Sequence, residues 1–487
     1  MAESRRYFLL SLAMAVAFAS AAGTAKIEAE EVFEAKLEAE DLFEAKIKAE
    51  DLFEVKIKAE DLFEAKIKAE DLFEAKIEAE DLFKAKIGAE DLFEDKIEAE
   101  ELFEGDIRLT PEQRAMLEER KAIPDLAYRW PEAEDGFPRV LYRFQDDMVN
   151  RPAIMDAINH WEEETCIRFE LTSAEETRPH LQFLKSNGCW SFIGMLQQPG
   201  QKIAIGDGCD NRGLIAHEIG HAIGFYHEQS RSDRDEHVNI HMENVIPHLQ
   251  KNFDKYVDDN FSVPYDLSSD MHYTSNSFTI EGKLTISTKD PLAQELIGQR
   301  FGLSHYDKLL ANRMYSCIPK WLVTCGLESD PCQNDGYLRS DCICACRSGT
   351  SGNFCEIVTQ DYHDSMISSC SQNVTSEGNV TSPNYPNNYP PGTKCVKWIQ
   401  APKCHFVNIT FSSFEMYGQS SQCDGHNCCF FDFLEIRTDD LYNGDVYCGT
   451  DITPGTSFTS KGHQLVLFFR GGDWSLFRLV SNSGFCP

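Results

Sequence analysis

One short stretch of the sequence holds side chains suited to binding a metal ion and activating water. His217 and His221 are four positions apart, so on a helix both imidazoles lie on one face, about one turn apart. His227 follows and offers a third nitrogen, which leaves one position of a tetrahedral zinc ion free. Glu218 is suited to take a proton from water and pass it to a leaving amine. These residues predict one zinc ion beside a general base, the chemistry of metal-assisted hydrolysis.

A helix followed by a sharp turn is needed to bring these three histidines together. Residues 214–223 are predicted to form that helix, and Gly224 follows directly. Glycine adopts backbone angles that end a helix and redirect the chain, so His227 can return toward the metal. Upstream, residues 140–144 and 181–184 are predicted as strands and residues 150–164 as a helix. The motif therefore lies in a domain of mixed helices and strands.

The stretch from His217 to Arg234 resembles the signature of the astacin family of zinc endopeptidases. The resemblance implies an α+β catalytic domain of the metzincin type over residues 122–318, with His217, His221 and His227 on one Zn²⁺ and Glu218 as the base. It also implies that the substrates are proteins.

Further residues owe their expected roles to the same resemblance. Ser269-Asp-Met-His-Tyr273 resembles the Met-turn of the family, which implies that Met271 packs beneath the zinc without binding it. Tyr273 would approach the metal and then stabilise the oxyanion of the reaction. Glu228 resembles the acid that receives the new N-terminus after activation. Taken alone, a methionine and a tyrosine are usually core residues.

A candidate inhibitory element precedes this domain. Phe103-Glu-Gly-Asp106 resembles the aspartate switch of astacin propeptides, in which Asp106 would occupy the water position on zinc in the zymogen. Gly105 would allow the backbone to approach closely. The alternative is that Asp106 is one acid among many. Release requires a cut, which we expect after Arg120-Lys121 by a trypsin-like protease, so that residues 23–121 form the propeptide.

Most of the propeptide is repetitive. Residues 25–104 are eight copies of a ten-residue unit close to Ala-Lys-Ile-Lys-Ala-Glu-Asp-Leu-Phe-Glu, and they carry about half of the net charge of −34. The composition favours helix, but a ten-residue period drifts by roughly 80° per copy, so no straight apolar stripe forms. One interpretation is an interaction or spacer rod. We favour the other, a tandemly expanded and solvated propeptide segment.

Composition indicates a secreted protein that does not bind nucleic acid. Residues 1–22 have the charged, apolar and small-residue order of a signal peptide, and no later apolar run is long enough to span a membrane. The net charge would repel a phosphate backbone. All 18 cysteines lie from Cys166 onward, as expected where disulfides persist. Four sequons are candidate glycosylation sites: Asn260, Asn373, Asn379 and Asn408.

The cysteines outline two further modules after the catalytic domain. Residues 321–356 resemble a small, disulfide-rich EGF-like module without a calcium-binding run of acids. Residues 370–486 resemble an all-β CUB sandwich, in which Asp432 matches a calcium-binding acid and Asp473 is a second candidate, whereas Tyr417 lies near the usual glutamate. We expect the CUB module to dock matrix or substrate, or to act as a passive spacer.

The resemblances also imply the disulfide pairing. Each cysteine of the catalytic domain has an alternative partner in a later module. The implied pairs are Cys166–Cys317 and Cys189–Cys209 in the catalytic domain, Cys325–Cys342, Cys332–Cys344 and Cys346–Cys355 in the EGF-like module, and Cys370–Cys395 and Cys429–Cys448 in the CUB module. The additional cysteines suggest Cys404–Cys486 and Cys423–Cys428.

Two functions of other classes compete with a secreted endopeptidase acting on extracellular proteins. One is an adhesive protein with an inert protease domain, which the intact histidines, Glu218 and Tyr273 disfavour. The other makes the acidic repeats the main function, which their removable position weakens.

Overall fold

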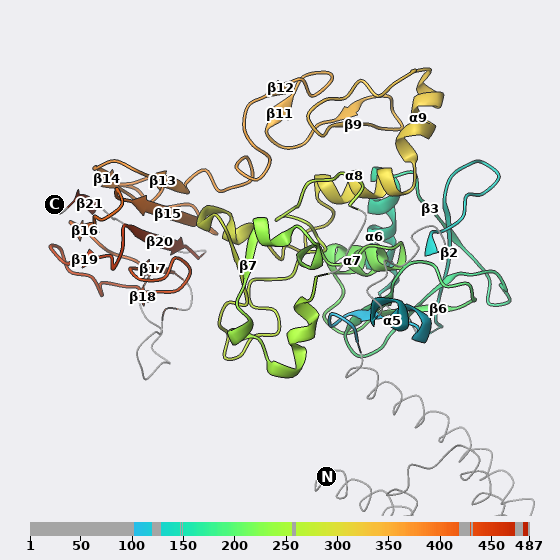
Figure 1. The fold of residues 1–487 in the computed structure, drawn as a ribbon, viewed down its shortest axis with the longest axis horizontal. Helices are drawn as coiled ribbons and strands as arrows, with labels where there is room; N and C mark the ends of the chain where they lie inside the picture. Colours follow the sequence, from blue (N-terminus) through green and yellow to red (C-terminus); the bar gives the residue numbers. More distant parts are fainter. Residues whose placement is uncertain are drawn as a thin grey trace, which may run out of the picture. The chain divides into compact units, whose positions relative to one another are not determined.

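The computed structural model describes residues 102–118, 128–146, 148, 150–255, 260–417, 429, 432–472 and 481–485 (Figure 1). The expected signal peptide, all but the last three residues of the repeats, and the expected cut after Arg120-Lys121 lie outside these residues.

The first part of the described chain is built around a six-stranded sheet of order β1-β5-β6-β4-β2-β3. Neighbouring strands are parallel except β5 and β6, which are antiparallel. The two strands expected from the sequence form β2 and β4. The strands are β1 (Ile107–Arg108), β2 (Arg139–Phe144), β3 (Arg168–Leu171), β4 (Leu181–Leu184), β5 (Cys189–Phe192) and β6 (Gln201–Ile205).

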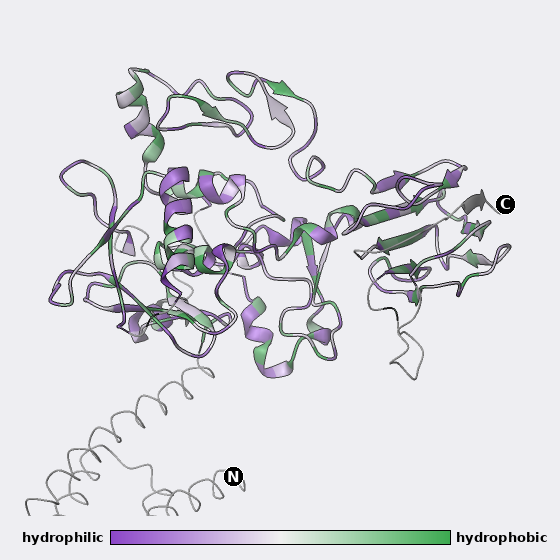
Figure 2. Cartoon of the chain, turned by 180° about the vertical axis from the view of Figure 1, so that it is seen from behind, coloured by the Kyte–Doolittle hydropathy of each residue, from purple (hydrophilic) through white to green (hydrophobic). Residues whose placement is uncertain are grey.

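Helix α6 (Arg151–Glu164) supplies one wall of the core beside the sheet. Its buried residues recur with helical spacing, so one side of the helix is apolar: Ile154, Ala157, Ile158 and Trp161. Bands of hydrophobic and hydrophilic residues mark this helix in Figure 2. The Trp161 indole donates a hydrogen bond to the carbonyl oxygen of Ala216, 3.1 Å away. Through this bond α6 holds the next helix, α7.

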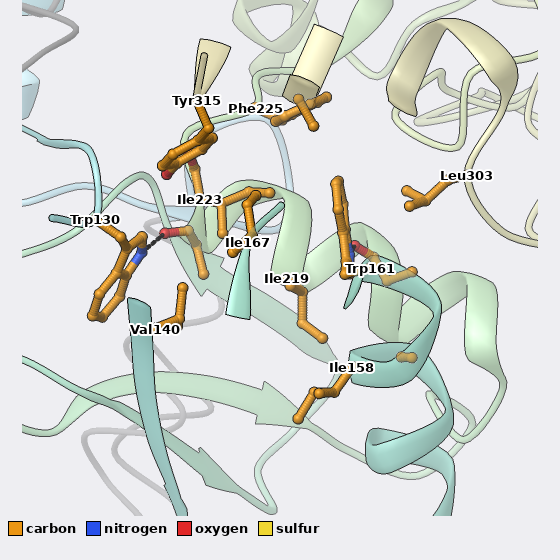
Figure 3. Close-up of a cluster of buried hydrophobic side chains, with 14 of the residues drawn as sticks. Trp130, Val140, Ile158, Trp161, Ile167, Ile219, Ile223, Phe225, Leu303 and Tyr315 are labelled. Atoms are coloured by element: carbon orange, nitrogen blue, oxygen red, sulfur yellow. Dashed lines mark hydrogen bonds between the residues drawn. The ribbon is translucent and has the colours of Figure 1, made fainter. Parts of the chain in front are cut away.

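Helix α7 (Arg212–Ala222) carries the first two histidines and is fixed at both ends. Asn211 caps its start, because its side chain accepts a hydrogen bond from the backbone N–H of Leu214. At its end, Gly224 has φ +110°, and its N–H and that of Phe225 donate to carbonyl oxygens of the last turn, which is a Schellman motif. Trp130 and Tyr315 donate to two further terminal carbonyls, and both contribute to the buried cluster of Figure 3.

The chain after α7 has little regular structure and is tied to α8 (His305–Met314). Ser304 and Asp307 form a capping box at the start of α8. The Asp307 carboxylate also accepts hydrogen bonds from the Ser269 hydroxyl and the backbone N–H of Asp270. The remaining elements of this part are α5 (Pro111–Glu118), η2 (Glu228–Ser230), η3 (Arg234–Glu236), β7 (Val238–Ile240), η4 (Met242–Asn244), η5 (Pro247–Phe253), β8 (Ile286–Thr288), η6 (Pro291–Leu296) and α9 (Cys317–Cys325).

The cysteine-rich part that follows contains two short two-stranded sheets, and the last part is a β-sandwich. A five-stranded sheet, β13-β15-β20-β17-β18, and a four-stranded sheet, β14-β21-β16-β19, share one apolar core. The mixed α/β domain and the all-β sandwich confirm the predicted fold classes. The strands are β9 (Tyr337–Leu338), β10 (Cys344–Ala345), β11 (Thr350–Ser351), β12 (Ile357–Val358), β13 (Gln372–Val374), β14 (Asn379–Val380), β15 (Lys394–Gln400), β16 (Val407–Phe411), β17 (Phe433–Arg437), β18 (Asp445–Tyr447), β19 (Ser457–Thr459), β20 (Gln464–Arg470) and β21 (Ser481–Phe485).

Among the described residues, disulfides join fourteen cysteines in seven pairs. They are Cys166–Cys317, Cys189–Cys209, Cys325–Cys342, Cys332–Cys344, Cys346–Cys355, Cys370–Cys395 and Cys429–Cys448. Cys404 forms no disulfide with any other described cysteine, and its expected partner, Cys486, lies outside the described residues together with Cys423 and Cys428. Among the helices that the structure describes, none is both long and apolar enough to cross a bilayer.

Gly213 at the start of α7 offers a test of how tightly the ligand helix is packed. A Cβ atom at this position would lie 2.0 Å from the backbone oxygen of Arg300. Replacing glycine by alanine in a helix normally gains up to about 1 kcal/mol. Here we expect Gly213→Ala to lower the free energy of unfolding by about 1–3 kcal/mol, because the backbone of the neighbouring loop must shift. Thermal unfolding of the precursor measures the change.

Gly462→Ala is the matched control, since no atom lies within 4 Å of its Cβ position. It should leave the free energy of unfolding unchanged within about 0.5 kcal/mol. A Gly213→Ala precursor more stable than the parent would contradict the packing argument.

Candidate metal centre and active site

The three histidines of the motif meet at one buried point. The Nε2 atoms of His217 and His221 are 3.1 Å apart, and those of His217 and His227 lie 3.3 and 3.2 Å from Oδ2 of Asp106. All three imidazoles are at most 2% exposed. Nitrogens bound about 2.1 Å from one tetrahedral ion lie about 3.4 Å apart, so the spacing suits zinc.

The protonation of these imidazoles follows from their other nitrogens. Nδ1 of His217 lies 2.8 Å from the Asp270 carbonyl oxygen, and Nδ1 of His221 lies 2.7 Å from that of Phe225. A carbonyl only accepts hydrogen bonds, so each Nδ1 carries the proton. The Nε2 lone pairs then face one another, and two lone pairs 3.1 Å apart form no hydrogen bond. A cation between them removes the repulsion, and neutral imidazoles are good ligands for zinc.

Electrostatics at this point also favour a cation. Burial alone would lower the pKa of His227, but the carboxylates of Asp106 and Glu104 offset it and raise that pKa to about 9. Burial alone would raise the pKa of Asp106, yet the surrounding histidines, His227 foremost, hold it well below its usual range. The imidazoles and Asp106 keep their ligand atoms within 4.8 Å of one another. The donor set of three nitrogens and one oxygen therefore fits a Zn²⁺ ion.

Glu218 lies one position after the first histidine, and its side chain is buried. Its Oε2 atom accepts no hydrogen bond from the described residues. Burial and the nearby Asp106 carboxylate raise the pKa of Glu218 well above its ordinary value. A buried carboxylate with one oxygen free beside a metal site has the properties of a general base.

Met271 and Tyr273 lie against the histidines, although they are distant in sequence. The Met271 sulfur would be 2.9 Å from a Cβ at Gly220, so it packs under α7 between the two histidine ligands. The Tyr273 ring lies 4.6 Å from the His227 ring, and its hydroxyl donates to the backbone oxygen of Glu104. Met271 thus supports helix α7, while the Tyr273 hydroxyl faces the segment that carries Glu104.

Glu228 is buried among polar partners next to the third histidine. Its Oε1 accepts a hydrogen bond from the backbone N–H of Asp266 at 2.7 Å and from Arg231 at 3.1 Å. Burial raises the pKa of Glu228 to about 8. The new N-terminus expected to reach it after activation, Ala122, lies outside the described residues.

The segment from Phe103 to Ile107 carries Asp106 into the site. Phe103 and Ile107 exchange backbone hydrogen bonds of 2.8 and 3.0 Å, which close a tight loop around the residues between them. Beyond the loop, β1 adds a parallel edge strand to β5, and the backbone N–H of Ser191 donates a hydrogen bond to the backbone carbonyl oxygen of Asp106. Gly105 has φ +89°, and a Cβ there would lie 2.5 Å from the ring of Phe278.

Two residues at this site were not singled out from the sequence. Glu104 is fully buried and touches His227, and Phe278 covers Gly105. The repeats obscured the first, because a glutamate follows phenylalanine in most copies. Phe278 lies in an uncharged segment, residues 274–280, and no local pattern links it to the histidines.

The remaining candidates are the expected calcium-binding positions of the CUB module and the sequon asparagines. Both oxygens of Asp432 are occupied, one by the Tyr389 hydroxyl and one by the Gly472 N–H, while Asp473 lies outside the described residues. Tyr417 is half exposed. Of the sequon asparagines, Asn373 and Asn379 are exposed and Asn260 and Asn408 are partly buried.

Comparison with known families finds two matches. Residues 123–316 match the astacin family of peptidases, and residues 370–476 match the CUB domain. Both match where the residues of the sequence resembled these families.

Individual relatives agree with the first match. Protein SpAN of Strongylocentrotus purpuratus is 37% identical over 387 residues, 75% of this chain and 60% of the relative. Blastula protease 10 of Paracentrotus lividus is 34% identical, over 75% of this chain and 61% of its own length. The chain thus spans about 60% of the length of these curated relatives. High choriolytic enzyme 1, a hatching enzyme zinc-protease from Oryzias latipes, is a solved structure at 35% identity, covering 40% of this chain and 98% of its own, with a TM-score of 0.38.

Proposed function

Because the chain belongs to the astacin family of peptidases through residues 123–316, we propose that it is a secreted zinc endopeptidase that is made as a latent precursor and hydrolyses extracellular proteins. One observation carries the proposal: the Nε2 atoms of His217, His221 and His227 converge around the Asp106 carboxylate, beside a Glu218 carboxylate whose Oε2 accepts no hydrogen bond from the described residues. Such an arrangement serves metal-assisted hydrolysis and has no evident structural use.

The proposed division of labour follows from what each side chain can do. His217, His221 and His227 would hold one Zn²⁺, which would supply Lewis-acid chemistry for the hydrolysis of a peptide bond. Glu218 takes a proton from the attacking water on its free oxygen and passes it to the leaving amine. Tyr273 donates its hydroxyl to the propeptide in the precursor, so removal of the propeptide frees that hydroxyl for a developing oxyanion.

Latency is proposed to come from Asp106. Its carboxylate lies among the three imidazoles, where it would fill the fourth position on zinc and exclude water. The β1 strand on β5 and the Gly105 contact with Phe278 support this placement. A trypsin-like protease cutting after Lys121 would separate the propeptide from the catalytic domain, and Glu228 would then receive the new N-terminus.

The remaining parts are proposed to serve secretion and substrate choice. The seven disulfides of the described part of the chain and exposed sequons at Asn373 and Asn379 suit an extracellular protein. The small module at residues 321–356 is proposed to be EGF-like, and the CUB domain is proposed to dock matrix or substrate. Residues 274–280 carry no charge and include Phe278, so we expect no preference for an acidic residue after the cut.

Replacing the base tests the catalytic assignment. Glu218→Gln keeps three imidazoles for the metal and removes the carboxylate, so zinc should stay near one per chain while peptidase turnover falls by about 10² or more. Metal analysis and peptide hydrolysis by the activated enzyme measure both quantities. Glu236→Gln, an exposed carboxylate outside the site, is the control and should change neither. Turnover like that of the parent in the Glu218→Gln enzyme would overturn the assignment.

Latency is tested by separating Asp106 from the repeats. We expect Asp106→Ala in the full-length chain to give measurable activity or premature self-processing, because the Asp106 carboxylate would no longer fill the position on zinc that water takes. Deletion of residues 25–94 should instead leave a secreted, silent precursor that trypsin still activates. Hydrolysis of a fluorogenic peptide, read before and after trypsin, reports both outcomes.

A repeat-deleted precursor that is active while still uncut at Lys121 would show that inhibition is spread along the propeptide. The exposed acid Glu112 of the same propeptide provides the control for Asp106→Ala, since Glu112→Ala should leave the precursor silent.

A further inference from the structure

Glu104 of the propeptide makes a contact with the third histidine that the proposed latency does not explain. One carboxylate oxygen lies 2.7 Å from Nδ1 of His227, and the other accepts a hydrogen bond from the Ser230 hydroxyl. Glu104 is 0% exposed. Burying a carboxylate costs free energy unless it is paired, so the contacts with His227 and Ser230 are needed to keep Glu104 in this position.

The backbone around Glu104 is also shaped for this contact. Glu104 has φ +51°, a left-handed conformation that residues other than glycine adopt uncommonly. Its carbonyl oxygen accepts the Tyr273 hydroxyl, and the loop is closed by the hydrogen bonds between Phe103 and Ile107. Side chain and backbone are therefore both fixed.

The three histidines differ in where their second partner comes from. His217 and His221 donate from Nδ1 to backbone carbonyls of the catalytic domain itself, at Asp270 and Phe225. The Nδ1 partner of His227 is a carboxylate from the propeptide. Such outer partners fix the tautomer and orientation of a metal-bound histidine. A carboxylate partner also makes the imidazole more basic and therefore a stronger ligand for the metal.

We propose that Glu104 is a positioning residue for His227, through which the propeptide makes the precursor hold its zinc more tightly than the mature enzyme does. This role rests on the proposed zinc site, but it is separate from inhibition by Asp106. Asp106 occupies the position on the metal that water would take. Glu104 acts behind the imidazole, and both leave together when the propeptide departs. The propeptide thus serves as a device for metal loading as well as for latency.

The test is the rate at which zinc passes from the uncut precursor to an excess of a chromogenic zinc chelator. Loss of an outer partner typically costs 10–100-fold in metal affinity. We expect Glu104→Ala to release zinc about 10–100 times faster than the parent, and Glu104→Gln to fall between them, because the amide keeps a neutral hydrogen bond to His227. Glu112→Ala, an exposed acid of the same propeptide, should release zinc at the parent rate.

Cleavage after Lys121 supplies an internal control, because residue 104 lies in the part removed and the Glu104 variants then yield identical mature chains. These chains should share one zinc-release rate that is faster than that of the parent precursor. Equal release from the parent and Glu104→Ala precursors would overturn the inference, as would a parent precursor that loses zinc as fast as the mature enzyme.

Peptidase activity of the uncut Glu104→Ala precursor separates positioning from simple anchoring of the loop. Positioning predicts a precursor that loses zinc faster but remains silent while Asp106 is present. Faster zinc loss together with activity of the uncut chain would show that Glu104 only holds the loop in place, which contradicts the inference. A parent mature enzyme without zinc or activity would instead refute the proposed function, so the two failures are distinguishable.

Discussion

The Nε2 lone pairs of His217 and His221 face each other at one buried point beside His227 and repel each other unless a cation lies between them, and the fold around α7 holds them there. The Asp270 and Phe225 carbonyls fix the tautomers of His217 and His221. The Schellman motif at Gly224 turns the chain so that His227 faces the first two. Trp130, Trp161 and Tyr315 donate to carbonyls of this helix and keep it in register with the core. A cation at this point thus relieves a repulsion that much of the domain is arranged to maintain.

The sequence was informative about this centre where local geometry decides it. One helix-turn segment contains two histidines four residues apart, the glycine that ends the helix and the third histidine. The structure forms this segment as expected. Met271 was assigned only through a family resemblance, because its contact with Gly220 joins residues far apart in the chain. Glu104 was missed because 123 positions separate it from His227, and no local periodicity reports such a contact.

Residues 103–108 combine weak and strong interactions with the rest of the domain. Strand β1 has only two residues, so its pairing with β5 alone contributes little binding energy. Arg108 stacks over Trp190 and Phe192, 5.2 and 5.3 Å from their ring centres, which adds a modest cation–π attraction. The carboxylates of Glu104 and Asp106 are far more specific, because each contacts particular histidines. The specificity of this segment therefore comes from the two carboxylates, and the strand and the cation–π contacts add to them.

The other repeats differ from residues 102–107 at the two positions that fit the histidine site. Most copies offer the same Leu-Phe-Glu and isoleucine spacing as residues 102–107, but they carry alanine and lysine where Gly105 and Asp106 stand. A Cβ at position 105 would lie 2.5 Å from the Phe278 ring, on a backbone at φ +89° that alanine rarely adopts. A protonated lysine at position 106 would bring a positive charge to a site that already selects a cation. Both differences act against the same placement, so the other repeats lack the two features that fit residues 105 and 106 to their surroundings. Under the proposed latency, duplication of the unit would lengthen the propeptide without creating competing inhibitory segments.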